Sequence, residues 1–440
     1  MRDFAISEDP AVQHQLDRLG ALSLPQGRIG LEPIHALLAK LGNPQNHLPP
    51  VFHIAGTNGK GSTCAFLRAM LETAGLSIHA ATKPHLVRYN ERIRLNGALI
   101  TDDALAAILG EVLDAAAHLP ADLAPSFFEA TTAAIFLSFS RTPADACVIE
   151  VGLGGRLDAT NVIPAPAACG IATLGIDHEA FLLRPEAGVP EDPLARIAFE
   201  KAGIARPHAA LVTQAYPPIA AHEVRAAAHR AQAMLVMRGE GWDAHVAGDA
   251  IHYRDEQGAL TLPLPTLPGA HQADNAALAV AMLRHQSAVH VPPEAMAQGI
   301  RAARWPARLQ RLAEGPITEA AGNRTVWLDG GHNPDAGLAI ARHFAGHPPL
   351  HLVLGMLSAK DPAALLAPLS GRLASLAVVP ASGHDAHTPA DFAPHSPLPV
   401  RAFDDVPSAL RAIEGPGEVL IAGSLYLAGE VLRLNQELPD

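Results

Sequence analysis

The sequence has few cysteines, few aromatic residues and few charged residues for its length. Its 440 residues include three cysteines, Cys64, Cys147 and Cys169, and aromatic and charged residues make up 4% and 17% of the chain. The cysteines stand far apart, without the Cys-x-x-Cys spacing of zinc sites. We therefore expect buried thiols in a reducing compartment, and neither a disulfide framework nor a zinc centre.

Basic residues are scarce relative to acidic ones, 32 against 44, which gives a net charge of −12. This balance argues against a broad nucleic-acid interface, although it allows a local basic pocket for a small anion. No run approaches 18 uninterrupted apolar residues, and the first residues lack the apolar segment of a signal peptide. We expect a soluble, cytoplasmic protein without a nucleic-acid or membrane partner.

The most informative stretch is VFHIAGTNGKGST, residues 51–63. An apolar run enters a glycine-rich turn, and the turn opens into a segment with helical apolar spacing. A strand, a glycine loop and a helix in this order can wrap backbone N–H groups around phosphate, with Lys60 adding a charge and Ser62 a hydroxyl for Mg²⁺. The pattern departs from the standard phosphate loop because Gly61 separates Lys60 from Ser62. An ordinary turn is the alternative, but the flanking strand and helix favour a nucleotide phosphate site.

The rest of the chain alternates strand and helix signals. The spacing predicts helix in 11–41, and an alternating stretch at 242–264 predicts a small antiparallel excursion. The pattern breaks at residues 304–306 and resumes as short strand and helix units. We predict an α/β fold with two domains: a phosphate-loop ATPase domain over 1–304 with a mainly parallel sheet, and a smaller Rossmann-like α/β domain over 305–440.

Polar side chains follow several predicted strands. Glu150 ends a buried apolar run, where a carboxylate is costly unless it is paired or bound to a cation. Beside a phosphate loop that cation would be Mg²⁺, which prefers oxygen ligands, while a salt bridge to Arg156 is the alternative. His178 follows the next strand, and Lys201 lies near the end of a helix. An ordinary histidine and a helix-capping lysine are their alternatives.

Two further regions are polar in a patterned way. The segment TKPHLVRYNERIRLNG carries Lys83 and Arg92 among many charges, which predicts a mobile loop beside an anionic substrate, with a solvated surface loop as the alternative. In the last third, Asp329 and His332 follow one strand and Ser424 follows another. Turn chemistry is the alternative for each, but two strands that both end in polar loops favour a second wall of the site.

Taken together, these stretches resemble the dihydrofolate synthase/folylpolyglutamate synthase family, which belongs with the Mur ligases to the ATP-dependent amide ligases. The matching motifs run in order through nearly the whole chain: AGTNGKGS, KPHLVRYNERI, FFEATT, EVGLGGRLDATN, DH followed by FEKAGI, HQADNAALA, WPARLQ, LDGGHNP and AGSLYLAGEV. The resemblance implies condensation of L-glutamate onto dihydropteroate or a reduced folate through an acyl phosphate, with ATP and Mg²⁺. It also implies a monomer.

The resemblance assigns roles to individual residues. The ATP-binding positions are Gly56, Thr57, Asn58, Gly59, Lys60, Gly61, Ser62, Asn275, Arg308 and Asp329. Ser62 and Glu150 would hold one Mg²⁺ ion, and His178 and a carbamylated Lys201 a second, because a CO₂ adduct presents oxygens where an ammonium would repel the metal. Phe128, Asp158 and Ala159 match the pterin-side pocket of the family, and Ser424 would help to seat glutamate. We count Lys83 and Arg92 of the polar segment as substrate positions as well. We expect Lys60, Lys201 and His332 to take part in catalysis.

Two features depart from the family pattern. Lys83 stands where the family usually has a serine that contributes to Mg²⁺ binding, and a cation cannot ligate Mg²⁺. Either water replaces that ligand, or Lys83 contacts a phosphate or a substrate carboxylate. The segment between His178 and Lys201 is longer than usual by a proline-rich stretch, for which we expect a bulged loop and an intact metal site.

Two other functions stay open from the sequence. One is a Mur-type ligase for cell-wall precursors, against which the EVGLGGRLDATN stretch argues. The other is a phosphate-loop NTPase switch or a catalytically silent binding module. Lys60, Glu150, His178, Asp329 and His332 disfavour the silent module, and a domain that closes on its substrate fits a ligase better than a switch. The sequence does not decide between addition of the first glutamate, of later glutamates, or of both.

Overall fold

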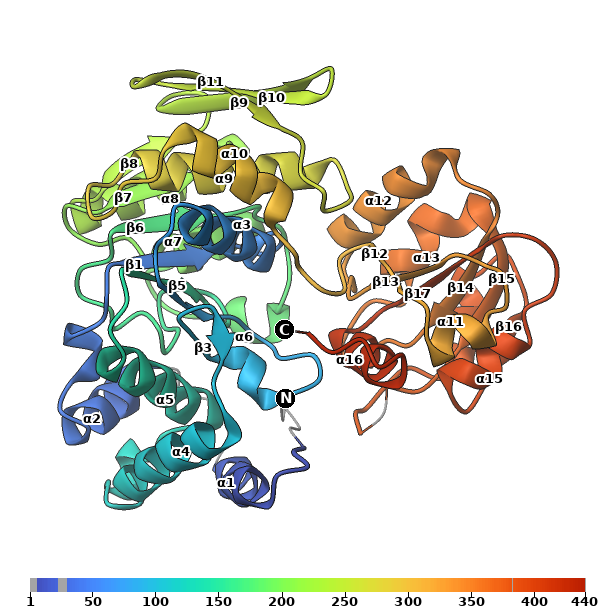
Figure 1. Ribbon diagram of the computed structural model, residues 1–440, viewed down its shortest axis with the longest axis horizontal. Helices are drawn as coiled ribbons and strands as arrows, with labels where there is room; N and C mark the ends of the chain where they lie inside the picture. Colours follow the sequence, from blue (N-terminus) through green and yellow to red (C-terminus); the bar gives the residue numbers. More distant parts are fainter. Residues whose placement is uncertain (1–5, 23–29, 382, 440) are drawn as a thin grey trace. The chain divides into compact units, whose positions relative to one another are not determined.

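The computed structural model describes residues 6–22, 30–381 and 383–439, and its chain divides into two compact units (Figure 1). The first unit contains the chain up to Pro84 together with Arg88–Thr266 and Ala273–Ala303. The second unit contains Arg304 onwards and two short segments, His85–Val87 and Leu267–Gln272. The sequence pattern did not separate these two short segments from their neighbours.

The first unit is built on an eight-stranded sheet with the order β4-β3-β2-β5-β1-β6-β7-β8. Its strands are β1 (Val51–Ala55), β2 (Ile78–Ala81), β3 (Arg94–Leu95), β4 (Ala98–Leu99), β5 (Ala146–Glu150), β6 (Ala168–Ile171), β7 (Ala210–Thr213) and β8 (Met234–Met237). Neighbouring strands from β2 to β8 pair in parallel, and β3 and β4 add an antiparallel edge. The central strands are buried along their whole length, which explains their continuous apolar runs. The prediction of a mainly parallel sheet is confirmed.

Helices of the first unit surround this sheet, some packed against its strands and others, such as α10, packed on neighbouring helices (Figure 1). They are α1 (Pro10–Gly20), α2 (Glu32–Lys40), α3 (Lys60–Thr73), α4 (Asp102–Ala117), α5 (Phe127–Arg141), α6 (Glu179–Leu182), α7 (Pro193–Ala202), α8 (Pro218–Ala231), α9 (His271–Arg284) and α10 (Pro293–Ala302). One apolar cluster joins α1, α2, α4 and α5 to β1 and β5, and another joins α7 and α8 to β6. The predicted helical stretch 11–41 therefore holds two helices, and residues 23–29 lie outside the described residues.

Helix α3 carries the phosphate-loop sequence at its start, and its packing is close. A Cβ atom added to Gly299 of α10 would lie 2.5 Å from the Cα atom of Met70 in α3. Only glycine allows the two helix backbones to approach so closely. The start of α3 is thus held by β1 on one side of the loop, and its body is held by α10.

The stretch 242–264 forms the predicted antiparallel excursion. Strands β9 (Trp242–Ala247), β10 (Ala250–Asp255) and β11 (Gly258–Pro263) make a separate three-stranded sheet. The buried Asp255 carboxylate accepts two hydrogen bonds of 2.6 Å from Arg284 at the end of α9. This ion pair fastens the small sheet to the helix that carries Asn275.

The second unit has a six-stranded sheet with the order β12-β13-β17-β14-β15-β16. Its strands are β12 (Gln310–Arg311), β13 (Val326–Asp329), β14 (Leu350–Leu354), β15 (Leu373–Val378), β16 (Val400–Ala402) and β17 (Glu418–Ala422), and its helices are α11 (Pro316–Ala320), α12 (Pro334–His343), α13 (Ala363–Leu369), α14 (Pro389–Phe392), α15 (Val406–Arg411) and α16 (Leu425–Leu434). All pairs are parallel except β12 with β13. One apolar cluster holds α11, α15 and α16, and another holds α12 and α13, which confirms a parallel sheet between two helical layers.

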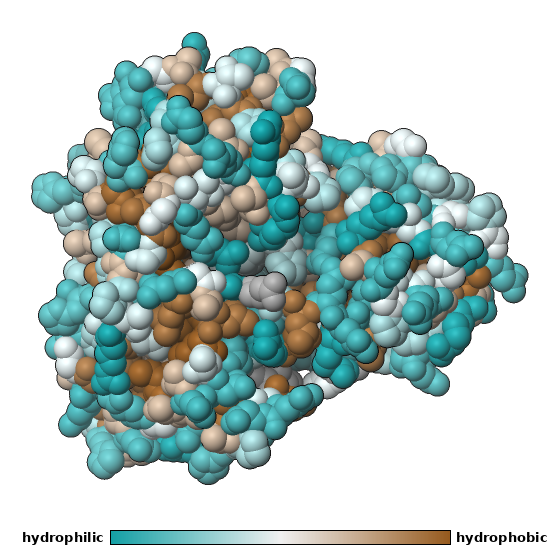
Figure 2. All heavy atoms as spheres, in the orientation of Figure 1, coloured by the Kyte–Doolittle hydropathy of each residue, from teal (hydrophilic) through white to brown (hydrophobic). Residues whose placement is uncertain are grey.

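The surface view is mostly hydrophilic, with smaller apolar patches between the polar side chains (Figure 2). Among the described residues, no helix combines the length and the apolar character needed to cross a bilayer.

Candidate active site

The loop between β1 and α3 is tied to the segment that follows the neighbouring strand β6. The Thr57 backbone N–H donates to the Thr173 carbonyl at 2.8 Å, and the Thr57 hydroxyl donates to the Gly175 carbonyl at 2.8 Å. The Lys60 ammonium donates to the carbonyls of Gly56 and Thr57 at 3.0 and 3.1 Å, so its charge lies over the loop. The glycine turn is therefore an ordered, cationic loop at the carboxyl edge of a parallel sheet, where open α/β sheets bind ligands.

Gly59 caps α3 in a backbone conformation that disfavours any side chain. Its φ angle is +86°, and a Cβ atom there would lie 2.4 Å from the Oδ1 atom of Asn275. The structure thus brings Asn275, which follows Gly59 by 216 residues in the sequence, directly against the loop.

 Asn275 comes from α9, and its side chain is buried. Of the predicted nucleotide residues, those of the loop and Asn275 are brought together.

Ser62 and Glu150 are buried at the same edge. Ser62 lies in the first turn of α3, and Glu150 ends β5, in register with Ile54 of β1. The two residues are 3% and 4% exposed. The Glu150 carboxylate accepts the backbone N–H of Lys83 at 3.1 Å, which fixes the start of the polar segment after β2. Both predicted Mg²⁺ ligands therefore offer hard oxygens next to the phosphate loop, as a Mg²⁺ site requires.

Arg156 does not form the salt bridge with Glu150 that was the alternative from the sequence. Its guanidinium pairs with Glu186 at 2.7 Å and with Glu200 at 2.9 Å. Arg196 pairs with the same two carboxylates at 2.8 and 3.0 Å. Glu186 belongs to the proline-rich insertion, so this network fastens the inserted loop to α7, the helix that carries Lys201.

Lys201 is 4% exposed in α7. Burial and, to a smaller extent, the Lys60 charge lower the pKa of its amine to about 7, although the nearby Asp177 charge acts in the opposite direction. A buried amine near that pKa has a large neutral fraction at neutral pH, and the neutral form is the one that reacts with CO₂. Asp177, whose charge acts on Lys201, accepts the backbone N–H of His178 at 2.7 Å.

Each predicted metal position contains a single carboxylate or imidazole. Accordingly, the part of the chain that the structure describes has no group of three or more His, Cys, Asp or Glu residues arranged to hold a metal ion. Mg²⁺ is commonly held by one or two protein oxygens together with substrate phosphates and water, so this donor set suits Mg²⁺ and not a structural zinc ion.

Asp158 organises the loop that follows β5. Its carboxylate accepts the backbone N–H groups of Gly152, Leu153 and Thr160 at 2.9 to 3.1 Å and the Thr160 hydroxyl at 2.6 Å. The Thr160 hydroxyl also contacts the Nε2 atom of the buried His53 at 2.8 Å. These bonds show that Asp158 shapes the loop, and they hold Ala159, which is buried, beside it.

Arg92 and Phe128 have opposite surroundings, although both were predicted on the substrate side. Arg92 is completely buried, and its guanidinium lies over the rings of Tyr89 and Phe127 at 5.1 and 5.8 Å. Phe128, in the first turn of α5, is 36% exposed and meets the edge of Phe127. The structure therefore buries Arg92 within the polar segment, whereas Phe128 is partly exposed at the surface.

The second unit groups its own candidate residues at the carboxyl ends of its strands. Asp329 ends β13, and its carboxylate accepts the backbone N–H of Leu309 at 2.7 Å. Arg308 lies between Ala307 and Leu309, which have φ angles of +54° and +45°, a strained arrangement for residues with a Cβ atom. Burial raises the pKa of Asp329, and the Arg308 charge lowers it.

His332 and Ser424 follow β13 and β17. The Nδ1–H group of His332 donates to the Gly330 carbonyl at 2.9 Å, which fixes the orientation of the ring. Ser424 is buried and caps α16, where its hydroxyl accepts the Tyr426 backbone N–H at 3.1 Å. Its capping bond is the turn chemistry that the sequence allowed as an alternative.

Some participants gave no signal in the sequence. Thr173 and Gly175 hold the phosphate loop, and Thr132 contacts the ammonium of Lys83 at 3.4 Å. Threonine and glycine are common in helices and turns, so only the folded arrangement reveals these contacts. The nearest signal was the position of Thr132 one helical turn after Phe128 in the FFEATT motif.

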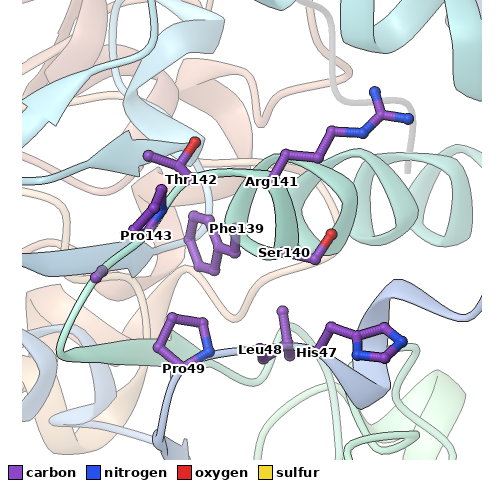
Figure 3. Close-up of a pocket in the computed structure, with 9 residues that line it drawn as sticks. His47, Leu48, Pro49, Phe139, Ser140, Arg141, Thr142 and Pro143 are labelled. Atoms are coloured by element: carbon purple, nitrogen blue, oxygen red, sulfur yellow. The ribbon is translucent and has the colours of Figure 1, made fainter.

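A separate pocket lies at the other end of β1 (Figure 3). It is lined by His47, Leu48, Pro49, Phe139, Ser140, Arg141, Thr142, Pro143 and Ala144. These residues precede β1 and end α5, whereas the phosphate loop follows β1. The pocket therefore contains none of the predicted site residues.

Comparison with known proteins places this geometry in a family. The chain is 32% identical to the dihydrofolate synthase/folylpolyglutamate synthase of Escherichia coli over 415 residues, which cover 92% of this chain and 91% of that protein. The structure of E. coli FolC in complex with DHPP and ADP is similar, with a TM-score of 0.83, 30% identity and 97% of both chains covered. The chain belongs to the dihydrofolate synthase/folylpolyglutamate synthase family.

Members of the dihydrofolate synthase/folylpolyglutamate synthase family are ATP-dependent ligases. A Yersinia pestis member, solved with Mn, AMPPNP and L-glutamate bound, has a TM-score of 0.80 and 29% identity, with 96% of this chain and 97% of that chain covered. A Halobacterium salinarum relative, a probable bifunctional folylpolyglutamate synthase/dihydropteroate synthase, is 32% identical over 413 residues, and the match covers 91% of this chain but only 49% of that protein. A comparison with models of protein families gave no match.

The substitution Gly59→Ala tests the loop geometry. It puts a side chain on a residue with a φ angle of +86° and brings its Cβ atom to 2.4 Å from the Asn275 amide, so we expect ATP affinity, measured by calorimetry, to fall at least about 10-fold. The double variant Gly59→Ala/Asn275→Gly removes the clash but not the strain and should recover part of the affinity.

The control is Gly75→Ala at the far end of α3. Gly75 has a similar φ angle of +83°, but, apart from its two chain neighbours, no residue that the structure describes has an atom within 4 Å of the added Cβ position. This control should cost about 1 kcal/mol of stability and leave ATP affinity unchanged. Full ATP affinity in Gly59→Ala would show that the loop does not hold the nucleotide in this conformation.

Proposed function

We propose that this protein joins L-glutamate to dihydropteroate and to the γ-carboxylate of reduced folates, using ATP and an acyl-phosphate intermediate. The observation that carries the proposal is the cationic glycine loop, with buried Glu150 ending the adjacent strand and buried Lys201 electrostatically coupled to Lys60. The family match over nearly the whole chain supports the substrate class, since its relatives carry these names and bind DHPP, ADP and glutamate.

The chemistry follows from the weakness of a carboxylate as an electrophile. An acceptor carboxylate oxygen attacks the γ-phosphorus of ATP, the bond to the β-γ bridging oxygen breaks, and ADP leaves. The amine of glutamate then attacks the acyl carbon, phosphate leaves, and the amine loses a proton to give the amide. In the first step two anions must meet, so positive charge at the transferred group lowers the barrier.

The chain supplies this charge through the loop. We propose that the backbone N–H groups of Gly56–Ser62 and the start of α3 bind the ATP phosphates, with the Lys60 ammonium neutralising them. Ser62 and Glu150 would hold one Mg²⁺ ion, and His178 with Lys201 a second. Bound Mg²⁺ would neutralise phosphate charge and orient the γ-phosphoryl group. Because of the family match, we propose that Asn275, Arg308 and Asp329 contact the nucleotide. His332 would contact the transferred phosphate, and Ser424 would contact glutamate.

The acceptor test compares dihydropteroate, tetrahydrofolate and no acceptor, each with ATP, Mg²⁺ and L-glutamate. We expect phosphate release and a glutamylated product, identified by mass, with both acceptors, because both present a carboxylate on the same pterin framework. Omission of glutamate should abolish product. A rate of ATP hydrolysis that is the same with either acceptor and with none would contradict the ligase and favour a phosphate-loop NTPase.

We also propose that Lys201 is carbamylated. Its near-complete burial excludes the bulk water that would favour an ammonium, and a carbamate would offer oxygen ligands to a metal. With ¹³C-bicarbonate, the wild-type protein should show a carbamate carbon signal in ¹³C NMR that Lys201→Met lacks. Identical spectra for the two proteins would rule the modification out.

We place the protein in the cytoplasm and propose that it acts as a monomer. The three cysteines are buried free thiols, as expected in a reducing compartment. The monomer rests on the family resemblance, and light scattering of the purified protein would reveal a larger assembly.

A further inference from the structure

Lysine is rare in this chain, which has only Lys40, Lys60, Lys83, Lys201 and Lys360. The Lys60 ammonium lies on the phosphate loop. Lys201 is buried, and the Lys60 charge lowers the pKa of its amine. Lys83 follows β2 at the same edge of the sheet, and its backbone N–H is bonded to Glu150. A third lysine at this edge can therefore bind an anion other than the one that Lys60 and Lys201 bind.

The Lys83 ammonium is only weakly engaged by the protein. Among the described residues its one hydrogen-bond partner is the Thr132 hydroxyl, at 3.4 Å. The Asp158 charge attracts it, but the Asp158 carboxylate is already bonded to four donors of its own loop. An ammonium has three donor hydrogens, so Lys83 keeps the capacity to bind an anionic ligand.

The position of Lys83 favours the acceptor over ATP. Strand β5 lies between β2 and β1, so the residue after β2 is two strand spacings, about 10 Å, from the loop after β1. Lys60 contacts the phosphate loop, whereas the Lys83 side chain points toward α5 and Gly152. A Cβ atom added to Gly152 would lie 3.6 Å from the Lys83 Nζ atom.

Helix α5 supplies an aromatic surface next to this cation. Phe128 and Thr132 are four residues apart on α5 and therefore lie on one face, about one 5.4 Å turn apart. Thr132 contacts the Lys83 ammonium, and the Phe128 ring is 36% exposed. An exposed ring one turn from a cation matches a ligand with a flat aromatic part that ends in a carboxylate.

We propose that Lys83 binds the reacting carboxylate of the pterin acceptor while Phe128 contacts its aromatic part, which makes Lys83 a specificity-determining residue. The inference rests on the proposed function. Its chemical consequence is a preference for an anionic acceptor that does not depend on ATP or on a metal ion.

The binding test uses the whole protein without ATP. Calorimetry measures dihydropteroate and its analogue in which hydrogen replaces the carboxylate. Wild-type protein should bind dihydropteroate more tightly. Lys83→Met should lose about 10- to 100-fold of affinity for dihydropteroate and keep its affinity for the analogue, because only the charged contact is removed. Lys83→Arg keeps the charge and should retain most of the preference.

The matched control is Lys40→Met, which removes a charge from the exposed end of α2. It should change neither affinity. A second readout uses wild-type protein with ε-¹³C-labelled lysine, whose five signals can be assigned by substitution. The Lys83 signal should shift when dihydropteroate binds and stay in place with the analogue, while the Lys40 signal should not move. This readout does not depend on the folding of any single variant.

The outcomes separate this inference from the proposed function. Equal binding of the two compounds by wild-type protein, or an unchanged preference in Lys83→Met, would overturn the inference alone. A separate titration measures ATP. A Lys83→Met variant that lost affinity for ATP and kept its affinity for dihydropteroate would assign the cation to phosphate and would overturn the inference as well. Wild-type protein that bound neither compound would overturn the proposed function together with the inference.

Discussion

The conformation of the loop between β1 and α3 is the constraint on which the site depends. Its backbone must turn tightly enough to aim N–H groups at an anion, and a left-handed glycine such as Gly59 makes this turn possible. Such a loop holds its shape only if its surroundings determine it. Thr57 ties it to the segment after β6, Asn275 closes over Gly59, and Gly299 lets α10 pack on the helix that continues it.

Charge at the carboxyl edge of the first sheet is the second organising feature. Lys60, Lys83 and Lys201 alternate with Glu150, Asp158 and Asp177, and several of these groups are buried. Buried charges of one sign would destabilise the fold, whereas a mixture of both signs offsets this cost, and among the described residues the Lys83 ammonium keeps only a long hydrogen bond of 3.4 Å with Thr132. That is the electrostatic arrangement a ligase needs, because its substrates are a nucleotide, a carboxylate and an amino acid.

Much of this arrangement can be predicted from the sequence, and the reason is local periodicity. The strands of both sheets show as apolar runs, and the polar residues that follow them must meet at one edge. The partners of individual charges cannot be predicted, because they depend on packing between distant segments. Arg156 pairs with Glu186 and Glu200 and not with Glu150, and the Arg92 guanidinium is buried over the rings of Tyr89 and Phe127.

The central claim is that this protein activates a carboxylate by transferring phosphate to it. The most direct measurement uses dihydropteroate with ¹⁸O in both carboxylate oxygens, together with ATP, Mg²⁺ and L-glutamate, and follows the label in the phosphate by mass spectrometry. Because the attacking carboxylate oxygen stays on phosphorus when the amine displaces phosphate, each product phosphate should carry one ¹⁸O atom. Unlabelled phosphate formed alongside the amide would contradict an acyl-phosphate route and the account built on it.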